Sequence, residues 1–162
     1  MFVLFQAASS IISELDVGTH FQPVLADPIA DPSTVKRVVL ISGKIYYDLI
    51  KERQARGLDD TVAFVRIEEL SPFPFQELKE ALEQYKGADV KEVCYLQEEP
   101  RNQGAYEHVA SRVGCVLDGL DLNFESRVKY LGRKESAVPA PGVGKLYARQ
   151  QQGIIASAFD GL

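Results

Sequence analysis

The chain has 162 residues, of which 46% are hydrophobic and 25% are charged, and its formal net charge at pH 7 is −5. This composition is typical of one soluble globular domain with a proper core, and the length is too short for two ordinary domains. The negative charge argues against a nucleic-acid partner or an anionic membrane, because both are bound through basic residues that neutralise phosphates.

Two cysteines and an apolar N-terminus are present, and neither feature indicates secretion. Cys94 lies within an apolar run, which predicts a buried core thiol, and its spacing from Cys115 matches neither a zinc site nor a disulfide framework. A reducing compartment fits this cysteine usage. The first five residues, MFVLF, are too short to span a bilayer, lack the basic region of a signal peptide and are unlike an Arg-rich transit peptide.

The first 36 residues are predicted to form an N-terminal arm or linker, which precedes an α/β domain over residues 37–162. The segment LADPIADPSTVK is rich in Asp and Pro, which favour irregular or extended backbone. Within the arm we expect a short helix over residues 9–16 and a short edge strand over residues 20–25.

From Arg37 onward, strand-like and helix-like patterns alternate. Continuous β-branched runs predict strands that are covered on both faces, whereas apolar residues at helical spacing predict helices, as at Leu78, Leu82 and Tyr85. Such alternation predicts a three-layer α/β/α fold, with a mostly parallel sheet of about five strands and helices on both faces. The expected strands are 37–42, 62–67, 92–97 and a shorter, more polar one near an edge at 127–132; the expected helices are 45–56, 75–85, one from about 106, and 145–159.

In a parallel sheet, ligands bind beyond the carboxyl ends of the strands, at the point where the strand order reverses. Ser42, Gly43 and Lys44 follow the first of these strands. Gly43 permits a tight turn, and the next helix N-terminus offers free N–H groups beside the Lys44 charge, so this loop is a candidate anion site. The alternative is a plain strand-to-helix turn with a solvated lysine, because neither GxxxxGK[ST] nor GxGxxG is present.

Two aromatic residues flank Pro74 in the loop SPFPF, which follows the second strand. The prolines restrict the backbone, so we expect an ordered loop that projects both rings. If Phe73 and Phe75 are exposed, they are candidates for a subunit contact, whereas the alternative is that both rings pack under the loop.

The stretch YLQEEPRNQG places two acids, a proline and two amides after the third strand. Adjacent residues of an extended segment point to opposite sides, so at most one of Glu98 and Glu99 faces the crevice and the pair is not an acid/base dyad. Asn102 or Gln103 is expected to cap the following helix. We interpret these four residues as a rigid, polar switch-point or interface loop, whose carboxylate meets a partner or a ligand.

No residue is predicted to be catalytic or to bind a metal. His20 lies in the arm and His108 in a helix, and neither has an obvious serine or cysteine partner, so both are interpreted as surface or structural residues. The sequence shows no metal-ligand spacing of His, Cys, Asp and Glu. From the residues alone, the chain is an α/β domain with a switch-point crevice.

Four motifs follow one another in the chain: RVVLISGKIYYDL, VAFVRIEELSPFPF, YLQEEPRNQGAYEHV and KYLGRKESAVPAPGVGKLYARQQQGII. In this order they resemble one family, the C-terminal domain of the thiamine-diphosphate-dependent first component of 2-oxoglutarate dehydrogenase or of the related 2-oxoadipate dehydrogenase. The resemblance covers about residues 35–159 and can be extended to the arm from residue 7. It implies a fold similar to the transketolase C-terminal domain, in which the strand ending at Ser42 neighbours the strand ending at Gln97.

The resemblance implies that thiamine diphosphate and magnesium belong to two preceding domains of the intact enzyme. No cofactor is expected in this chain, which lacks the family's GDG motif. The intact enzyme would oxidatively decarboxylate a 2-oxo acid in the tricarboxylic acid cycle, as a homodimer in a complex with an acyltransferase core and dihydrolipoyl dehydrogenase. It would lie in the mitochondrial matrix of a eukaryote or in the cytoplasm of a bacterium, and the choice between 2-oxoglutarate and 2-oxoadipate stays open.

Two functions are therefore expected for a chain that is a fragment, a truncated gene model or a stand-alone domain. The first is assembly and regulation of the enzyme, without catalysis. The alternative is an independent module that binds an acyl-CoA or a nucleotide, as some bacterial relatives do near this domain. The candidates for an anion site are Ser42, Lys44, Arg53 and Arg133. An enzyme with a glutamate base is a third hypothesis, for which no partner nucleophile can be named.

Overall fold

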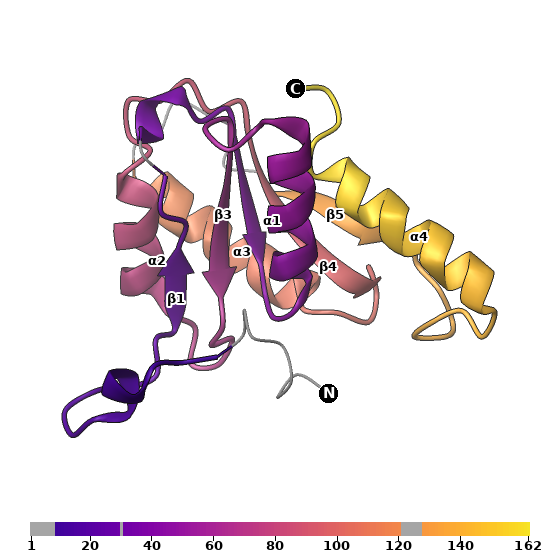
Figure 1. Cartoon of the computed structure of the whole chain (residues 1–162), viewed down its shortest axis with the longest axis horizontal. Helices are drawn as coiled ribbons and strands as arrows, with labels where there is room; N and C mark the ends of the chain where they lie inside the picture. Colours follow the sequence, from indigo (N-terminus) through magenta and orange to yellow (C-terminus); the bar gives the residue numbers. More distant parts are fainter. Residues whose placement is uncertain (1–8, 30, 121–127) are drawn as a thin grey trace.

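The computed structural model describes residues 9–29, 31–120 and 128–162, and these form a five-stranded sheet with helices packed against it (Figure 1). The strand order is β1-β3-β2-β4-β5, in which β1 is antiparallel to its neighbour and the other pairs are parallel. The predicted α/β fold with a mostly parallel sheet is confirmed. The strands are β1 (Val24–Ala26), β2 (Arg37–Ile41), β3 (Val62–Ile67), β4 (Glu92–Pro100) and β5 (Lys129–Arg133), and the helices are α1 (Ile45–Arg56), α2 (Phe75–Glu83), α3 (Tyr106–Asp118) and α4 (Gly144–Ser157).

Two apolar clusters, one on each face of the sheet, form the core. Helices α2 and α3 cover one face, and α1 and α4 cover the other (Figure 1). Because side chains alternate along a strand, Leu40 packs in the cluster under α2 and α3, whereas its neighbour Ile41 packs in the cluster under α1 and α4. The continuous apolar run of β2 is explained by this two-sided burial.

The helical phases predicted from the sequence are confirmed. Leu78, Leu82 and Tyr85 are each at most 2% exposed, as expected for one apolar face. Helix α1 ends where Gly57 adopts a left-handed conformation (φ 66°) and its N–H donates to the carbonyls of Arg53 and Gln54. The observed bounds of α1 and β3 match the predicted ranges, and α2 ends two residues earlier than expected.

Strand β2 lies between β3 and β4, so the strand order reverses at β2. Val39 pairs with Phe64 of β3 on one side and with Cys94 of β4 on the other. The chain runs from β2 to β3, and then crosses to the far side of β2 to form β4. The family resemblance implied that the strand ending at Ser42 and the strand that carries Gln97 are neighbours. The pairing of β2 with β4 confirms this.

Strand β4 is longer than predicted. It continues past Gln97 to Pro100, which pairs with Arg133, and the register shifts between Leu96 and Pro100. Glu98 and Glu99 therefore lie on the strand and not in the loop after it. The strand can end in proline because the missing N–H falls at its last residue, where the ladder stops.

Part of the N-terminal arm belongs to the sheet. Val24 to Ala26 form β1, which pairs with β3 at the edge of the sheet, so the predicted edge strand is present but begins later than expected. The expected helix over residues 9–16 is a single 3-10 turn, Ile12–Leu15. Within residues 9–29, 31–120 and 128–162, no helix is long and apolar enough to cross a membrane.

Candidate functional site

The carboxyl ends of β2 and β4 meet at the predicted switch point. Gly43 (φ 75°) turns the chain toward α1, and Lys44 Nζ lies 3.1 Å from Glu98 Oε1. The loop after β2 and the end of β4 are thus joined across the reversal of strand order. The hydrogen bond to Glu98 raises the pKa of Lys44, although partial burial opposes this shift.

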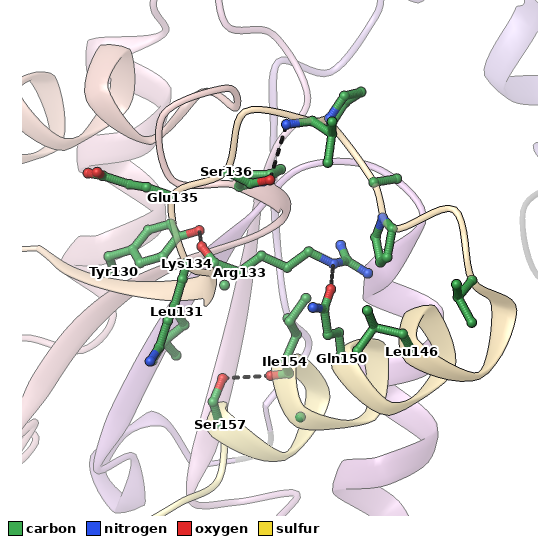
Figure 2. Close-up of a pocket in the computed structure, with 18 of the residues that line it drawn as sticks. Tyr130, Leu131, Arg133, Lys134, Glu135, Ser136, Leu146, Gln150, Ile154 and Ser157 are labelled. Carbon is green, nitrogen blue, oxygen red and sulfur yellow. Dashed lines mark hydrogen bonds between the residues drawn. The ribbon is translucent and has the colours of Figure 1, made fainter.

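Glu98 is the centre of a polar network that connects β4, β5 and α4. Gln151 Nε2 donates to Glu98 Oε1 at 2.8 Å, and Arg133 donates to the Glu98 carbonyl. Arg133 also donates to Gln150 Oε1 at 3.1 Å, as Figure 2 shows, and to Gln151 Oε1 at 2.9 Å. Its guanidinium lies over the Tyr147 ring, 5.0 Å from the centroid. The two predicted cations that flank the switch point therefore both have partners within the chain.

The sequence analysis missed the two glutamines of this network. Gln150 and Gln151 lie in the run QQQ of α4, which carries no pattern that distinguishes a buried partner from a solvated side chain. Their role follows from the packing of α4 beside β5, which brings both amides to Arg133.

A small cavity of about 260 Å³ lies at the same switch point, lined in part by Ser42, Tyr95 and Glu99. Ser42 Oγ donates to the Ile67 carbonyl at 2.7 Å, so the Tyr95 hydroxyl is the donor in its 3.2 Å contact with Ser42 Oγ. Burial raises the pKa of the Tyr95 phenol. The cavity is smaller than usual small-molecule sites, which enclose roughly 300–1,000 Å³.

Helix α3 is capped by Gln97, and the prediction that Asn102 or Gln103 would cap it is wrong. Gln97 Oε1 accepts a hydrogen bond from the Tyr106 N–H at 2.9 Å. Gly104 leaves room for this side chain, because a Cβ there would lie 2.2 Å from Gln97 Nε2. Sequence reasoning missed Gln97 because a capping side chain normally sits at the helix start, whereas this one reaches α3 from β4.

Asn102 and Gln103 instead hold the loop that follows β5. Asn102 Nδ2 donates to the Ser136 carbonyl and Asn102 Oδ1 accepts from the Ser136 N–H, both at 3.1 Å. Gln103 Nε2 donates to the same carbonyl at 2.5 Å. The amides therefore attach the loop of residues 134–143 to the segment between β4 and α3. They do not cap α3, which is capped by Gln97.

Arg53 lies apart from the other candidate cations. It is about 12 Å along the axis of α1 from Ile45, since an α-helix rises about 1.5 Å per residue. Its guanidinium pairs with the buried carboxylate of Asp27 and donates to the Val62 carbonyl at 2.8 Å, while Asp27 also accepts from the Phe64 N–H at 3.1 Å. The Arg53 guanidinium thus connects the arm, α1 and β3 by the ion pair and hydrogen bonds of its NH groups, and we do not include it in the candidate anion site.

The two phenylalanines of the SPFPF loop differ in exposure. Phe73 is partly buried against the core, whereas Phe75 is 47% exposed, and the ring centroids are 4.9 Å apart. His108 Nε2 lies 2.9 Å from the Leu70 carbonyl and attaches this loop to α3. Neither predicted alternative describes both rings, because one packs against the core and the other stays accessible for a contact.

A larger groove, which the sequence did not indicate, lies between β5, residues 134–143 and α4 (Figure 2). It encloses about 770 Å³ and its walls are mostly apolar, with Leu131, Leu146 and Ile154 among them. Arg133 stretches across it toward Gln150. Its volume lies within the roughly 300–1,000 Å³ of ordinary ligand sites.

The described residues offer groups for hydrogen bonding and ion pairing. Burial raises the pKa of the Cys94 thiol to about 12, so this sulfur stays protonated at neutral pH. His108 is held by the Leu70 carbonyl. In the part of the chain that the structure describes, no group of three or more His, Cys, Asp and Glu residues could hold a metal ion.

The chain is similar to enzymes that are several times longer. The 2-oxoglutarate dehydrogenase E1 component of Azotobacter vinelandii is 41% identical over 158 residues, which make up 95% of this chain and 16% of that protein. The 2-oxoadipate dehydrogenase complex component E1 of Homo sapiens is 35% identical over 160 residues, or 98% of this chain and 16% of that protein. A Xenopus laevis relative named "2-oxoglutarate dehydrogenase-like, mitochondrial" is 37% identical over 156 residues, 94% of this chain and 14% of that protein. The chain therefore spans about one sixth of the length of these relatives.

One solved structure and one family model match the chain over most of its length. A solved structure described as "Split gene transketolase, inactive beta4 tetramer" matches with a TM-score of 0.52 and 16% identity, over 88% of this chain and 43% of that one. At this identity the likeness shows the fold alone. The family model described as "2-oxoglutarate dehydrogenase C-terminal" matches residues 9–159, which include both the arm and the switch point. The chain belongs to the 2-oxoglutarate dehydrogenase C-terminal family.

Proposed function

We propose that the chain acts as a non-catalytic assembly and regulatory domain in the first component of a 2-oxoglutarate or 2-oxoadipate dehydrogenase. The observation that carries this proposal is the closure of the switch point by the chain's own side chains. Lys44, Glu98 and Arg133 bind one another or α4, where an α/β enzyme would hold its substrate. Charged side chains that are paired within the chain in this way support a structural role.

In this proposal the decarboxylation belongs to other domains. Among the described residues, no group of three or more His, Cys, Asp and Glu could hold a metal ion. The remaining domains would hold thiamine diphosphate and magnesium, and the complete enzyme would work in the tricarboxylic acid cycle with an acyltransferase core and dihydrolipoyl dehydrogenase. A eukaryotic protein would lie in the mitochondrial matrix and a bacterial one in the cytoplasm.

Within the enzyme, residues 37–162 would form the body of the domain and residues 1–36 its arm. Phe75 is accessible beside Phe73 and would contact another subunit of a homodimer. Asn102 and Gln103 would shape a second part of that contact, because they attach residues 134–143 to the segment that precedes α3.

The size of the native polypeptide tests this proposal. An antibody raised against this domain, with peptide mass spectrometry of the band, should identify a protein several times larger than the 18.0 kDa of this chain. That protein should bind thiamine diphosphate in calorimetry and decarboxylate 2-oxoglutarate or 2-oxoadipate, which also identifies the acid. The 162-residue chain alone should show no heat of thiamine diphosphate binding. Tight binding by the short chain would contradict a non-catalytic role.

A second candidate function is a module that binds an acyl-CoA or a nucleotide. The larger groove favours it, because about 770 Å³ of mostly apolar space lies beside the Arg133 guanidinium. An anionic group there would have to replace the Gln150 and Gln151 amides or the Glu98 carbonyl as the partner of Arg133. Lys44 and Ser42 would contribute from the switch-point side, where Lys44 is half exposed.

Thermal denaturation with acetyl-CoA or AMP tests this second function. A bound ligand raises the melting temperature through mass action, by RT ln(1 + [L]/Kd) in free energy. Lys44→Ala should abolish the increase, while the matched control Lys86→Ala, exposed at the end of α2, should preserve it. A melting temperature that does not change at millimolar ligand would exclude the module and leave the assembly role.

A further inference from the structure

Arg133 is a buried cation without a carboxylate partner. Among the described residues three arginines are buried, Arg37, Arg53 and Arg133, with 4%, 6% and 9% of their surface exposed. Arg37 pairs with Glu92 and Arg53 pairs with Asp27, whereas Arg133 forms no ion pair with a described residue. A buried charge normally has a counter-ion because its transfer out of water is costly, so the third arginine departs from the pattern of the other two.

Neutral groups surround the Arg133 guanidinium. It donates to the Glu98 carbonyl, to Gln150 Oε1 at 3.1 Å and to Gln151 Oε1 at 2.9 Å, and it lies over the Tyr147 ring. These oxygens accept its hydrogen bonds but carry no formal negative charge. An anion in place of one of them would form a charge-assisted hydrogen bond, which is about twice as strong as a neutral one.

The groove beside α4 places this cation next to an apolar space. Figure 2 shows Arg133 extended across the groove, whose walls include Leu146 and Ile154. The groove encloses about 770 Å³, and the other charged residues of its described lining, Lys134 and Glu135, are exposed and of opposite sign. A matching ligand therefore offers one negative group to Arg133 and an apolar body to the walls.

Gln150 is the acceptor that a ligand can replace. Its side chain lines the groove, and among the described residues it bonds to Arg133 alone. Gln151 by contrast also donates to Glu98 Oε1 at 2.8 Å, and the Glu98 carbonyl belongs to the backbone of β4, so both stay in place. A carboxylate is planar like the Gln150 amide and can take its position. A phosphate presents three acceptor oxygens and would also compete with the fixed Glu98 carbonyl.

We propose that the groove beside α4 binds an amphipathic monocarboxylate, a medium-chain fatty acid, whose carboxylate replaces the Gln150 amide on Arg133. The hydrocarbon chain lies against the aliphatic walls of the groove. The bound anion supplies the negative charge that Arg37 and Arg53 obtain from within the chain. This inference rests on neither proposed function, because the ligand carries no nucleotide and no second subunit is needed.

Equilibrium dialysis of the 162-residue chain against radiolabelled octanoate tests the site. Octanoate should bind at a single saturable site with a dissociation constant below about 1 mM. Hexanoate should compete about tenfold more weakly, because it buries two fewer methylene groups. Octanol has the same chain without the charge, and it should compete at least about tenfold more weakly than octanoate.

Substitutions of Gln150 test the exchange of acceptors on Arg133. Gln150→Ala removes the competing amide, so it should tighten octanoate binding by about two- to tenfold. Gln150→Glu supplies the missing carboxylate from within the chain, so it should weaken octanoate binding at least about tenfold and raise the melting temperature. The matched control is Gln152→Ala, an exposed glutamine of the same helix, which should leave the affinity unchanged.

The opposite effects of the two Gln150 variants separate the proposal from a general loss of folding, which would weaken binding in both. Three results would overturn it: no saturable octanoate binding at millimolar concentration, octanol that competes as well as octanoate, or equal octanoate affinity in the unchanged chain and both variants. Because octanoate carries no phosphate, its failure to bind would refute this site alone. The tests with thiamine diphosphate, acetyl-CoA and AMP decide the proposed functions separately.

Discussion

The variant Gly104→Ala tests whether the turn between β4 and α3 depends on the close approach of Gly104 to Gln97. A Cβ at residue 104 would lie 2.2–2.4 Å from the end of the Gln97 side chain, nearer than real Cβ contacts. Gln97 is 5% exposed, and its amide bonds to the Tyr106 N–H and to the carbonyls of Glu99 and Pro100. The side chain therefore cannot move aside without breaking these bonds.

The magnitude follows from the three bonds that the Gln97 amide would lose. Each contributes about 0.5–1.5 kcal/mol net, and one of them is the cap of α3, so Gly104→Ala should lower the free energy of unfolding by about 2–4 kcal/mol. Urea denaturation followed by circular dichroism measures this change. The matched control is Gly153→Ala in α4, where a Cβ meets nothing within 4 Å; this helical position should be stabilised by up to about 1 kcal/mol.

A double-mutant cycle identifies the cause of the loss. In a Gln97→Ala background the clash is absent, so adding Gly104→Ala should cost no more than a few tenths of a kcal/mol. An equal cost of Gly104→Ala in both backgrounds would refute the steric explanation, and an unchanged urea midpoint for Gly104→Ala alone would refute the contact itself.

Three further predictions concern the core and its charges. Leu82→Ala should lower the free energy of unfolding by about 2–5 kcal/mol, since this side chain on the buried face of α2 is 1% exposed; an unchanged urea midpoint would mean that the packing face is wrong. Arg53→Ala should cost about 3–5 kcal/mol because it leaves the buried Asp27 carboxylate without its cation, and Asp27→Asn in the same chain should restore part of that loss in urea titration. Burial alone would raise the pKa of Glu92, but the hydrogen bonds and positive charges of Lys129 and Arg37 outweigh burial and lower that pKa. The stability from Glu92 is thus present above the ordinary glutamate pKa of about 4.3 and lost as the pH falls below it, so urea midpoints between about pH 6 and pH 3 should decline less steeply in Glu92→Gln.

The sheet and its helices were predictable because the strands are continuous apolar runs and the helices carry apolar residues at helical spacing. The β-branched runs of β2 and β3 fit only strands that are covered on both faces, and Gly57 supplied the end of α1. The extension of β4 was not predictable in this way. Glu98, Glu99 and Pro100 are poor strand formers, and they continue the strand because β5 lies beside it and Pro100 pairs with Arg133.

At the candidate site, the sequence indicated which loops lie close together, but not which residues form hydrogen bonds with one another. Spacing along the chain placed Lys44 and Glu98 at one end of the sheet, since consecutive parallel strands end on the same side. The amides were assigned to the nearest helix because local capping is the commonest role of Asn. Asn102 instead binds Ser136, which is 34 residues away, and no local pattern encodes a contact at that separation. Arg53, another candidate for the anion site, pairs with Asp27 of the arm, 26 residues away, and no local pattern encodes that contact either.

The charges at the switch point also bear on which proposed function is favoured. An anion that approaches Lys44 meets a cation already paired with the Glu98 carboxylate, which is held by the Gln151 amide as well. The anion must therefore take one of two positions. It either displaces Glu98, whose partly buried carboxylate then loses its cation, or it binds beside Glu98 and is repelled by that negative charge. Arg133 presents the same difficulty, because its partners include a backbone carbonyl that cannot move away. Lys44→Ala should therefore perturb the junction of α1, β4 and α4 even without ligand, as expected for a domain whose switch point serves architecture.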